Sequence, residues 1–155
     1  MKGNQQVIDK LNFLLADELT AISQYMVHAE MCTNWGYAKL AEATEKRAIG
    51  EMKHAEKHIG RIVFLEGRPA VSNLNPMHIE NDVKSQLESD HAAEQGAITA
   101  YNEAIRLCYE LGDAGTREIL EDVLKDEEEH IDFIESQLDQ IAQMGLGVYL
   151  GTLVE

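Results

Sequence analysis

The feature that most limits the fold of this chain is a repeat at an offset of 76 residues. Residues 18–25 read ELTAISQY and residues 94–101 read EQGAITAY, with Glu, Ala, Ile and Tyr at matching places. The offset is about half of the 155 residues. The repeat therefore predicts two similar halves, each of which presents a glutamate, Glu18 or Glu94, at the same position.

Apolar residues recur at helical spacing, and only two prolines interrupt the chain. The pattern predicts long helices over residues 5–34, 38–65, 82–111 and 115–143, and a short one over 146–153. Both prolines lie in the loop between the second and third helices. A 28-residue helix is about 42 Å long, and 16 extended residues span about 50 Å, so this loop can run the length of the bundle. We therefore predict an all-α, ferritin-like four-helix bundle with one long crossover loop and a short fifth C-terminal helix, in a single domain of residues 1–155.

The net charge of −15 argues against nucleic-acid binding, because phosphates need Lys and Arg. The charge fits either a surface that attracts cations or a merely soluble one. The N-terminus does not resemble a signal peptide, and no window reaches the roughly 18 apolar residues of a membrane span. Cys32 and Cys108 are too few for a disulfide scaffold. We therefore expect a cytoplasmic protein with no nucleic-acid or membrane partner.

The same offset relates two Glu-x-x-His motifs. Glu51 and His54 lie on the second predicted helix, and Glu127 and His130 lie at the matching places on the fourth. Residues three apart share one face of a helix. Ordinary surface charge explains a single motif of this kind, as it does for Glu88 and His91, whose repeat-mates are not ligands.

Six repeat-related residues in core phase are harder to explain as surface charge, because a buried carboxylate is costly unless it is compensated. Together they predict a pair of metal sites, each with one His and one terminal Glu, bridged by the two other Glu. Oxygen-rich ligation with one nitrogen per metal suits iron or manganese. The predicted ligands are Glu18, Glu51, His54, Glu94, Glu127 and His130.

At these residues the sequence resembles the bacterioferritins over essentially the whole chain. The segments MKGN, NWG, FLEG, DEEEHID and MGLGVYL all match that family. The resemblance implies that the six ligands form a ferroxidase centre, which oxidises Fe(II) with oxygen or peroxide. It also implies a 24-subunit shell that stores the ferric mineral, haem b bound by Met52 from each of two subunits, and a small ferredoxin as reductant.

Some residues depart from the family pattern or are open to two interpretations. Lys46 and Gly50 occupy places where some relatives carry a His and an Asp that face the cavity, so the route of iron into the cavity stays open. We expect Asp126 to support His54. His58 is expected to be a satisfied core or surface histidine, because its repeat-mate is Ile134.

Tyr25 and Tyr101 follow their glutamates by two helical turns. They are expected to hydrogen-bond the bridging carboxylates, with core packing equally compatible with Tyr101. The resemblance implies electron donation by Tyr25. Cys32 and Cys108 should lie near opposite ends of the bundle, without an intrachain disulfide.

Two apolar features point to contacts between subunits. Met52 points away from the bundle, in line with Ile49, Ile59 and Val63, while Leu19 and Met26 extend the patch from the first helix. A methionine more often packs than binds a metal, but the resemblance favours haem ligation by Met52. The tail LGVYLGTLV either folds back on its own bundle or clusters around a fourfold axis of a shell.

Two other functions compete with the ferroxidase. A peroxide reductase of the rubrerythrin kind usually carries a Cys-x-x-Cys module, which this sequence lacks. A non-catalytic shell or haem-carrier subunit usually loses ligands, whereas all six are present. The sequence leaves open the oxidant, the native haem type and the presence of a second subunit type.

Overall fold

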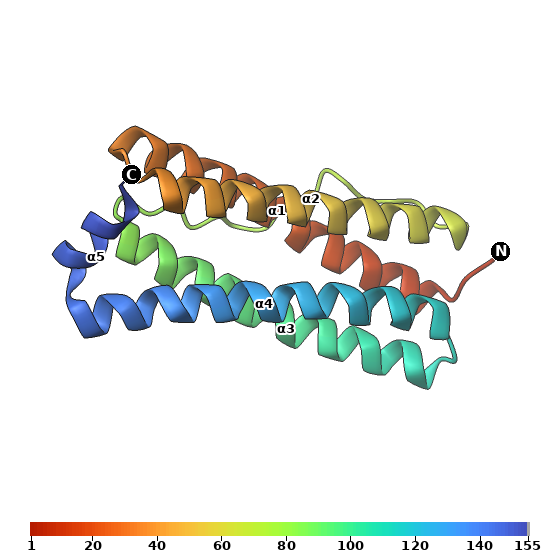
Figure 1. Cartoon of the computed structure of the whole chain (residues 1–155). Coiled ribbons are helices and arrows are strands. Elements are labelled where there is room, and N and C mark those ends of the chain that lie inside the picture. The colour runs from red at the N-terminus through yellow and green to blue at the C-terminus, as the bar shows by residue number, and fades with distance from the viewer. Residues whose placement is uncertain (155) are drawn as a thin grey trace.

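The computed structural model describes residues 1–154, which form a bundle of four long helices with a short fifth helix at one end (Figure 1). The helices are α1 (Gln5–Trp35), α2 (Ala38–Phe64), α3 (Val83–Glu110), α4 (Ala114–Met144) and α5 (Leu146–Leu153). No strand occurs among the described residues. The predicted all-α, ferritin-like bundle is therefore confirmed.

Short polar side chains determine where three of the long helices begin. Asn4, Asp82 and Asp113 each accept a backbone N–H from the first turn of the helix that follows. These bonds satisfy donors that have no partner within the helix. At the other end of α1, Gly36 adopts a left-handed conformation with φ 84°, which glycine reaches without steric cost. The resulting tight turn makes α1 and α2 an antiparallel hairpin.

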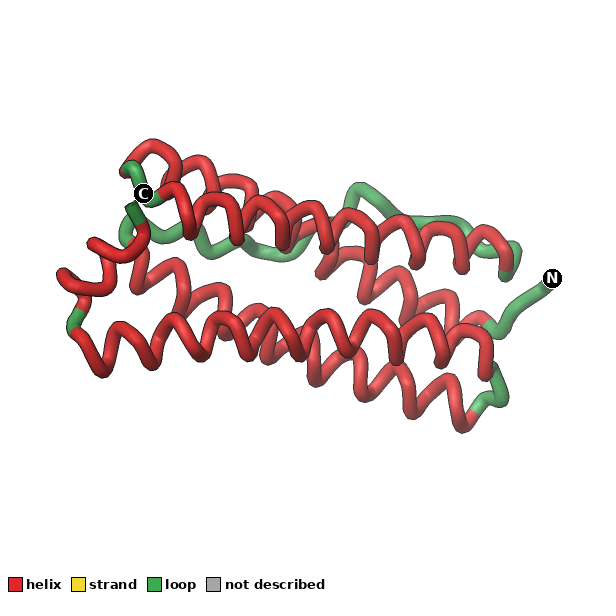
Figure 2. Tube along the Cα trace, viewed as in Figure 1, coloured by secondary structure: helices red, strands yellow, loops and turns green. Residues whose placement is uncertain are grey.

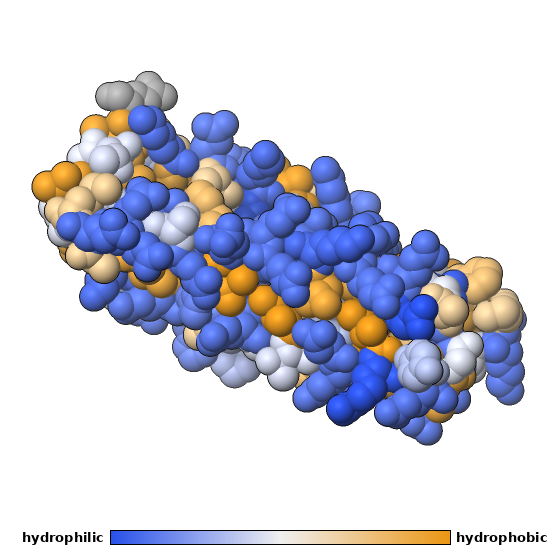
Figure 3. Space-filling model, turned by 60° about the horizontal axis from the view of Figure 1, so that its bottom comes forward, coloured by the Kyte–Doolittle hydropathy of each residue, from blue (hydrophilic) through white to orange (hydrophobic). Residues whose placement is uncertain are grey.

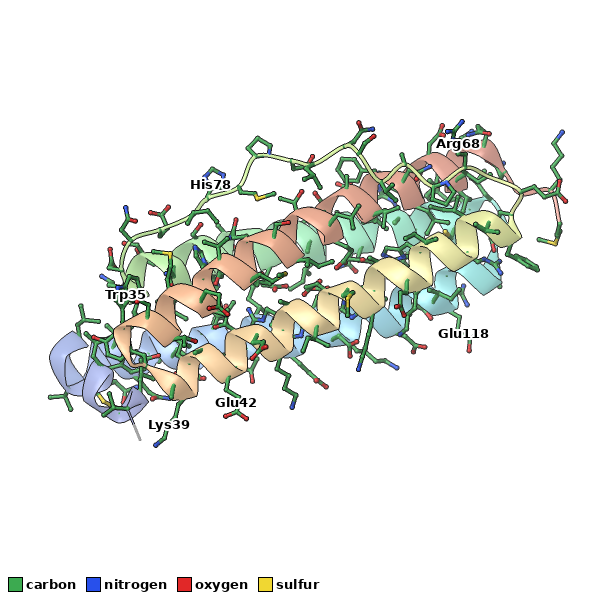
Figure 4. The ribbon with its side chains drawn as sticks, turned by 90° about the horizontal axis from the view of Figure 1, so that it is seen from above. Trp35, Lys39, Glu42, Arg68, His78 and Glu118 are labelled. Carbon is green, nitrogen blue, oxygen red and sulfur yellow. The ribbon has the colours of Figure 1, made fainter. Side chains whose placement is uncertain are left out.

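The segment between α2 and α3 is extended and runs along the bundle beside α1, as the green trace in Figure 2 shows. In Figure 4, Arg68 and His78 mark two points along it. Its backbone N–H groups are bonded by α1 side chains: Asn12 accepts from Ala70, Thr20 from Asn75, Gln24 from His78 and His28 from Glu80. The α1 positions differ by multiples of four, so they form one ridge of the helix. This ridge fixes the crossover.

The buried interior consists of two apolar clusters separated by a polar zone. One cluster includes Leu11 and Leu120, and the other includes Leu40 and Ile134. The buried polar residues between them include Glu18, Gln24, Arg47, Glu51, His54, Asp90, Glu94 and Glu127. Because a polar interior needs compensation, this zone is where a functional site is expected.

Cys108 belongs to the first cluster and Cys32 to the second, and both are buried free thiols. The predicted absence of an intrachain disulfide is confirmed.

The C-terminal helix α5 packs on α4 and α2 with one face only. Tyr149 and Leu153 are buried in the second apolar cluster, and the Tyr149 hydroxyl donates to Gln137. The other face leaves Val148 63% exposed and Leu146 38% exposed. The tail therefore folds back on its own bundle and still presents an apolar face outward.

The outward surface is mostly polar, with local apolar areas. Figure 3 shows hydrophilic side chains over most of one face, with an apolar streak between them. No described helix is long and apolar enough to cross a membrane. On the α1–α2 hairpin, the exposed large apolar residues are Phe13, Met26, Val27, Ile49, Met52, Val63 and Phe64. Leu19 and Ile59, which were expected in this patch, instead pack against the first core cluster.

The α1 side chains that bond the crossover backbone predict what happens when one of them is removed. Asn12 both donates to the Arg68 carbonyl and accepts from the Ala70 amide. Asn12→Ala should accelerate hydrogen exchange of the Ala70 amide by about tenfold, because a lost hydrogen bond costs about 1 kcal/mol or more. Asn102→Ala is the control, since Asn102 bonds only within its own helix. Equal exchange at Ala70 in all three proteins would show that the anchor has no effect.

Candidate metal centre

The structure brings all six predicted ligands together in the middle of the bundle, with each helix contributing. Glu18 comes from α1, Glu51 and His54 from α2, Glu94 from α3, and Glu127 and His130 from α4. The four glutamates and His54 are at most 3% exposed, while His130 is partly exposed at its side chain. Six residues from four helices thus form one buried cluster.

The cluster divides into two overlapping groups, each of which could hold a metal ion. One group is Glu18, Glu51, His54 and Glu127, and the other is Glu51, Glu94, Glu127 and His130. Within each group the donor atoms lie within 4.8 Å of one another. Glu51 and Glu127 belong to both groups. This is the sharing expected of two bridging carboxylates.

The two histidines face the carboxylates in similar ways. His54 Nδ1 lies 3.0 Å from a Glu127 oxygen and 3.5 Å from a Glu18 oxygen. His130 Nδ1 lies 3.1 Å from a Glu51 oxygen and 3.7 Å from a Glu94 oxygen. The repeat in the sequence therefore becomes an approximate twofold arrangement of donors.

Several donor atoms in the cluster are buried without a hydrogen-bond partner. They are Glu18 Oε2, Glu51 Oε1, Glu94 Oε2, Glu127 Oε1 and His130 Nδ1. The neighbouring groups are close but not aligned for hydrogen bonding. Because buried polar atoms normally have partners, lone pairs left over in this number fit cations at the centre. The donor set of oxygens with one nitrogen per group fits iron or manganese.

In the metal-free centre, the carboxylates also raise the pKa of both histidines. Burial lowers the pKa of His130, but the carboxylates of Glu127, Glu51 and Glu94, which lie 3.1 to 3.7 Å from its Nδ1, outweigh burial and raise the pKa to about 11. The pKa of His54 is raised even further by the same kind of balance. Both imidazoles are therefore cationic near neutral pH when no metal is bound.

The glutamates differ in pKa. Burial, together with Glu127, raises the pKa of Glu94 to about 7. Burial likewise raises that of Glu18 well above its usual value. For Glu51 the burial effect is outweighed by the close approach of Glu18 and the two histidines, so its pKa falls to about 2. The shared glutamates are therefore the more acidic ones, since the pKa of Glu127 is also lowered.

The two tyrosines bond the terminal carboxylates, Glu94 and Glu18, and not the shared ones. Our prediction that they bond the bridging carboxylates was therefore wrong. Tyr25 donates to Glu94 over 2.6 Å, and Tyr101 donates to Glu18. Each tyrosine thus reaches across to the other half of the repeat.

The histidines have unequal outer partners. His54 Nε2 lies 2.8 Å from Asp126, which confirms the predicted support for His54. The matching place beside His130 belongs to Gly50, whose missing Cβ would lie 3.9 Å from His130 Cε1. Within residues 1–154, no side chain bonds the outer nitrogen of His130. The His54 ring is therefore fixed at both nitrogens and the His130 ring is not.

Sequence reasoning missed Arg47, which is 8% exposed. Its guanidinium lies 3.6 Å from Glu94, stacks over the Tyr25 ring at 5.2 Å and donates to the His130 carbonyl. The repeat could not reveal it, because its repeat-mate is Val123. A permanent positive charge thus lies on one side of the centre only.

A second polar network lies next to the centre. Asp90 accepts hydrogen bonds from Gln24 and His28, and both of those residues also hold the crossover. None of the three has a matching residue in the other half. The rejected pair behaves as expected, since His91 bonds Glu135 away from the centre and Glu88 pairs with Lys84.

A cavity of about 450 Å³ leads to the four glutamates from the side of the bundle that the crossover covers. Asp17, Asn75 and His78 lie at its outer part. Its walls include the small residues Ala21, Ala92, Ala93, Gly96, Ala97 and Ala100. The small side chains leave this part of the cavity unfilled.

Comparisons with known proteins agree with this fold and site. A ferritin-like domain matches residues 8–144, so the chain is a ferritin-like protein. Bacterioferritin from Rhodobacter capsulatus is 44% identical over 145 residues, and that from Brucella melitensis biotype 1 is 42% identical over 145 residues; each alignment covers 94% of this chain and 90% of the relative. The chain belongs to the bacterioferritin family.

A solved structure supports the same assignment. Rhodobacter capsulatus bacterioferritin matches with a TM-score of 0.98 and 41% identity, over 100% of this chain and 97% of that one. That protein is described with a metal-free dinuclear site and a haem iron in a crystallographic special position.

The protonated histidines predict that metal binding releases protons. Each imidazole must lose its proton to bind a metal, and so must Glu18 and Glu94 where burial keeps them protonated. Co(II) should therefore displace at least about two protons per pair of ions, and its affinity should rise with pH. A pH-stat titration of the metal-free protein between about pH 6 and about pH 8 measures both. His91→Ala, outside the centre, should behave like the parent. Binding that releases no protons and does not vary with pH would contradict the assignment.

Proposed function

We propose that this chain is a ferroxidase subunit that oxidises Fe(II) to Fe(III) with oxygen or peroxide and stores the ferric mineral inside a 24-subunit shell. Membership of the bacterioferritin family supports a role in iron storage. The observation that carries the catalytic proposal is the set of buried donor atoms without partners, which converge in two groups. In this proposal Glu18, Glu51, His54, Glu94, Glu127 and His130 bind the substrate ions.

The residues of the centre suit oxidation as well as binding. Carboxylate oxygens are hard donors, and they stabilise Fe(III) more than Fe(II) because its charge is higher. In a buried site this preference is strengthened, since little water screens the charges. Glu51 and Glu127 belong to both groups and would hold two ferrous ions side by side. Two electrons are then available together for one molecule of oxidant.

Removing a ligand tests this proposal. Glu18→Ala and His130→Ala should each slow oxidation of the first two Fe(II) per subunit by at least about 100-fold, since losing even the outer partner of a ligand costs about 10- to 100-fold. Stopped-flow absorbance after anaerobic loading and an oxygen or peroxide pulse measures the rate. His91→Ala is the control. Ligand variants that oxidise these ions at the parent rate would exclude the centre.

The competing functions lack comparable support. A rubrerythrin-type peroxide reductase would need a further redox module, and the two thiols of this chain are buried in separate cores. A non-catalytic shell subunit would not need six clustered donors.

We also expect the protein in the cytoplasm.

Assembly would bury the apolar surfaces that one chain leaves open. The exposed faces of α2 and α5 carry Met52, Val63 and Val148, and monomers rarely expose large apolar patches without a partner. We infer a twofold contact through the α1–α2 face and a second contact through α5. Light scattering of the full chain should give a 24-subunit particle. Monomers or dimers alone at micromolar concentration would contradict the shell.

Haem b fits the outward face of α2. Met52 is 47% exposed, and Met26 and Ile49 are exposed on the same hairpin. A twofold axis across this face would bring two Met52 thioethers to one iron. The haem iron of the Rhodobacter capsulatus protein occupies a special position, which is a symmetry element. When bound, haem would supply electron transfer for reductive iron release, with a small ferredoxin as the donor.

Replacing Met52 tests the haem site. Met52→Leu keeps the apolar volume but removes the sulfur, so the purified shell should lose its low-spin haem spectrum and most of its haem. Met26→Leu removes a neighbouring exposed thioether and should keep both. Haem content per subunit and the absorbance spectrum are the measurements. A Met52→Leu shell with the parent haem content and spectrum would eliminate Met52 as the ligand.

A further inference from the structure

The terminal glutamates of the two donor groups are held alike. The groups share two glutamates and differ in the others: the His54 group contains Glu18, and the His130 group contains Glu94. One oxygen of each terminal glutamate accepts a hydrogen bond from a tyrosine of the opposite half, and the second oxygen has no partner. A difference between the two groups therefore has to come from their neighbours.

Arg47 supplies such a difference on the side of Glu94. Its Nη1 lies 3.6 Å from the Glu94 oxygen that Tyr25 bonds, which is too far for a hydrogen bond, and its Nε has no partner. The guanidinium carbon lies 5.2 Å from the Tyr25 centroid and 5.9 Å from that of Phe133. Nη2 donates to the His130 carbonyl. These contacts fix a buried positive charge beside Glu94 without occupying its free oxygen.

The side of Glu18 has no comparable cation. Within residues 1–154, neither a lysine nor an arginine forms an ion pair with Glu18. His58, which was expected to be a satisfied core or surface histidine, is buried there and bonds Tyr101, but its Nδ1 has no partner. Burial, followed by the charge of His54, lowers the pKa of His58 to about 3, so this imidazole is neutral. A fixed positive charge thus lies beside one terminal glutamate only.

The charge of Arg47 opposes a metal ion in the His130 group. A divalent ion that replaces the proton on His130 adds one positive charge next to a guanidinium that cannot lose its own. Like charges in a buried site repel with little screening. An adjacent arginine changes the proton affinity of a carboxylate by about 10- to 1000-fold, and a metal ion bound to Glu94 meets the same repulsion.

The outer partners of the histidines act in the same direction. Asp126 lies 2.8 Å from His54 Nε2, whereas His130 has Gly50 at the matching place. An outer partner that holds a histidine ligand strengthens metal binding by about 10- to 100-fold. The His54 group therefore has a supported ligand and no opposing arginine, and the His130 group has the reverse.

We propose that Arg47 makes the His130 group the weaker metal position, so that each subunit fills its His54 group first. This inference rests on the proposed function, in which the six residues bind two Fe(II). Two electrons are available together only when both ions are present, so oxidation waits for the second ion. Arg47, acting through Glu94, thereby sets the Fe(II) concentration at which the pair is complete.

Stepwise binding of Co(II) to the assembled, metal-free protein tests the proposal. Anaerobic calorimetric titration at about pH 8.5, where Glu94 with its pKa of about 7 is ionised, gives the two binding constants. In the parent, the second ion should bind at least about tenfold more weakly than the first. Arg47→Gln removes the charge and should strengthen the second step by at least about tenfold, with little change in the first. Arg47→Lys keeps the charge and should resemble the parent.

Anomalous diffraction at the cobalt edge locates the ions. Crystals equilibrated with a limiting amount of Co(II) should show the stronger peak in the His54 group, both in the parent and in Arg47→Lys. In Arg47→Gln the peak in the His130 group should rise relative to the other. Asp126→Asn is the matched comparison, because it should weaken the first step without strengthening the second.

The outcomes separate this inference from the proposed function. A parent that fills the His130 group first, or an Arg47→Gln protein with the parent's ratio of binding constants, overturns the role of Arg47. A ratio that closes only in Asp126→Asn also overturns it, since the support of His54 would then explain the difference. Absence of cobalt from both groups overturns the metal centre and the proposed function. If Arg47→Gln does not assemble, Arg47→Met, which is uncharged and similar in length, is measured instead.

Discussion

Four glutamates buried together impose the main constraint on this structure. Glu18, Glu51, Glu94 and Glu127 are each at most 3% exposed, and like charges in a poorly screened interior repel strongly. Positive charge must compensate them, from protonated His54 and His130 in the metal-free chain or from metal ions. The polar middle and the two separate apolar cores are consequences of this requirement. The apolar cores stabilise the helices on either side, so that the middle can be specialised for binding.

The two halves of the protein share their ligands but differ in what supports them. The repeat supplies each half with a Glu, a Glu-x-x-His and a tyrosine that reaches the opposite carboxylate. Arg47 lies beside Glu94 and has no counterpart beside Glu18. His58, which bonds Tyr101, and Asp126, which bonds His54, have no counterparts in the other half. A duplicated ligand set is thus placed in an asymmetric environment. This asymmetry gives the two donor groups, and the two tyrosines, different surroundings.

The sequence was sufficient to predict the bundle and the convergence of the six ligands, because helical spacing and one offset determine which side chains face inward. The crossover followed from loop length alone. Arg47 was missed, since an unrepeated arginine on a helix is usually a surface residue. The carboxylates that Tyr25 and Tyr101 bond were predicted wrongly, because spacing along one helix does not reveal which side chain of a neighbouring helix a hydroxyl reaches. The core packing of Leu19 and Ile59 depends likewise on how closely the helices approach.

The paired metal sites are tested most directly by an anomalous diffraction map of crystals soaked anaerobically in Fe(II), recorded on both sides of the iron absorption edge. Two iron peaks are expected in each subunit. One should lie among Glu18, Glu51, His54 and Glu127, and the other among Glu51, Glu94, Glu127 and His130. Fully loaded crystals with no peak in the middle of the bundle, or with iron bound only elsewhere on the subunit, would contradict it.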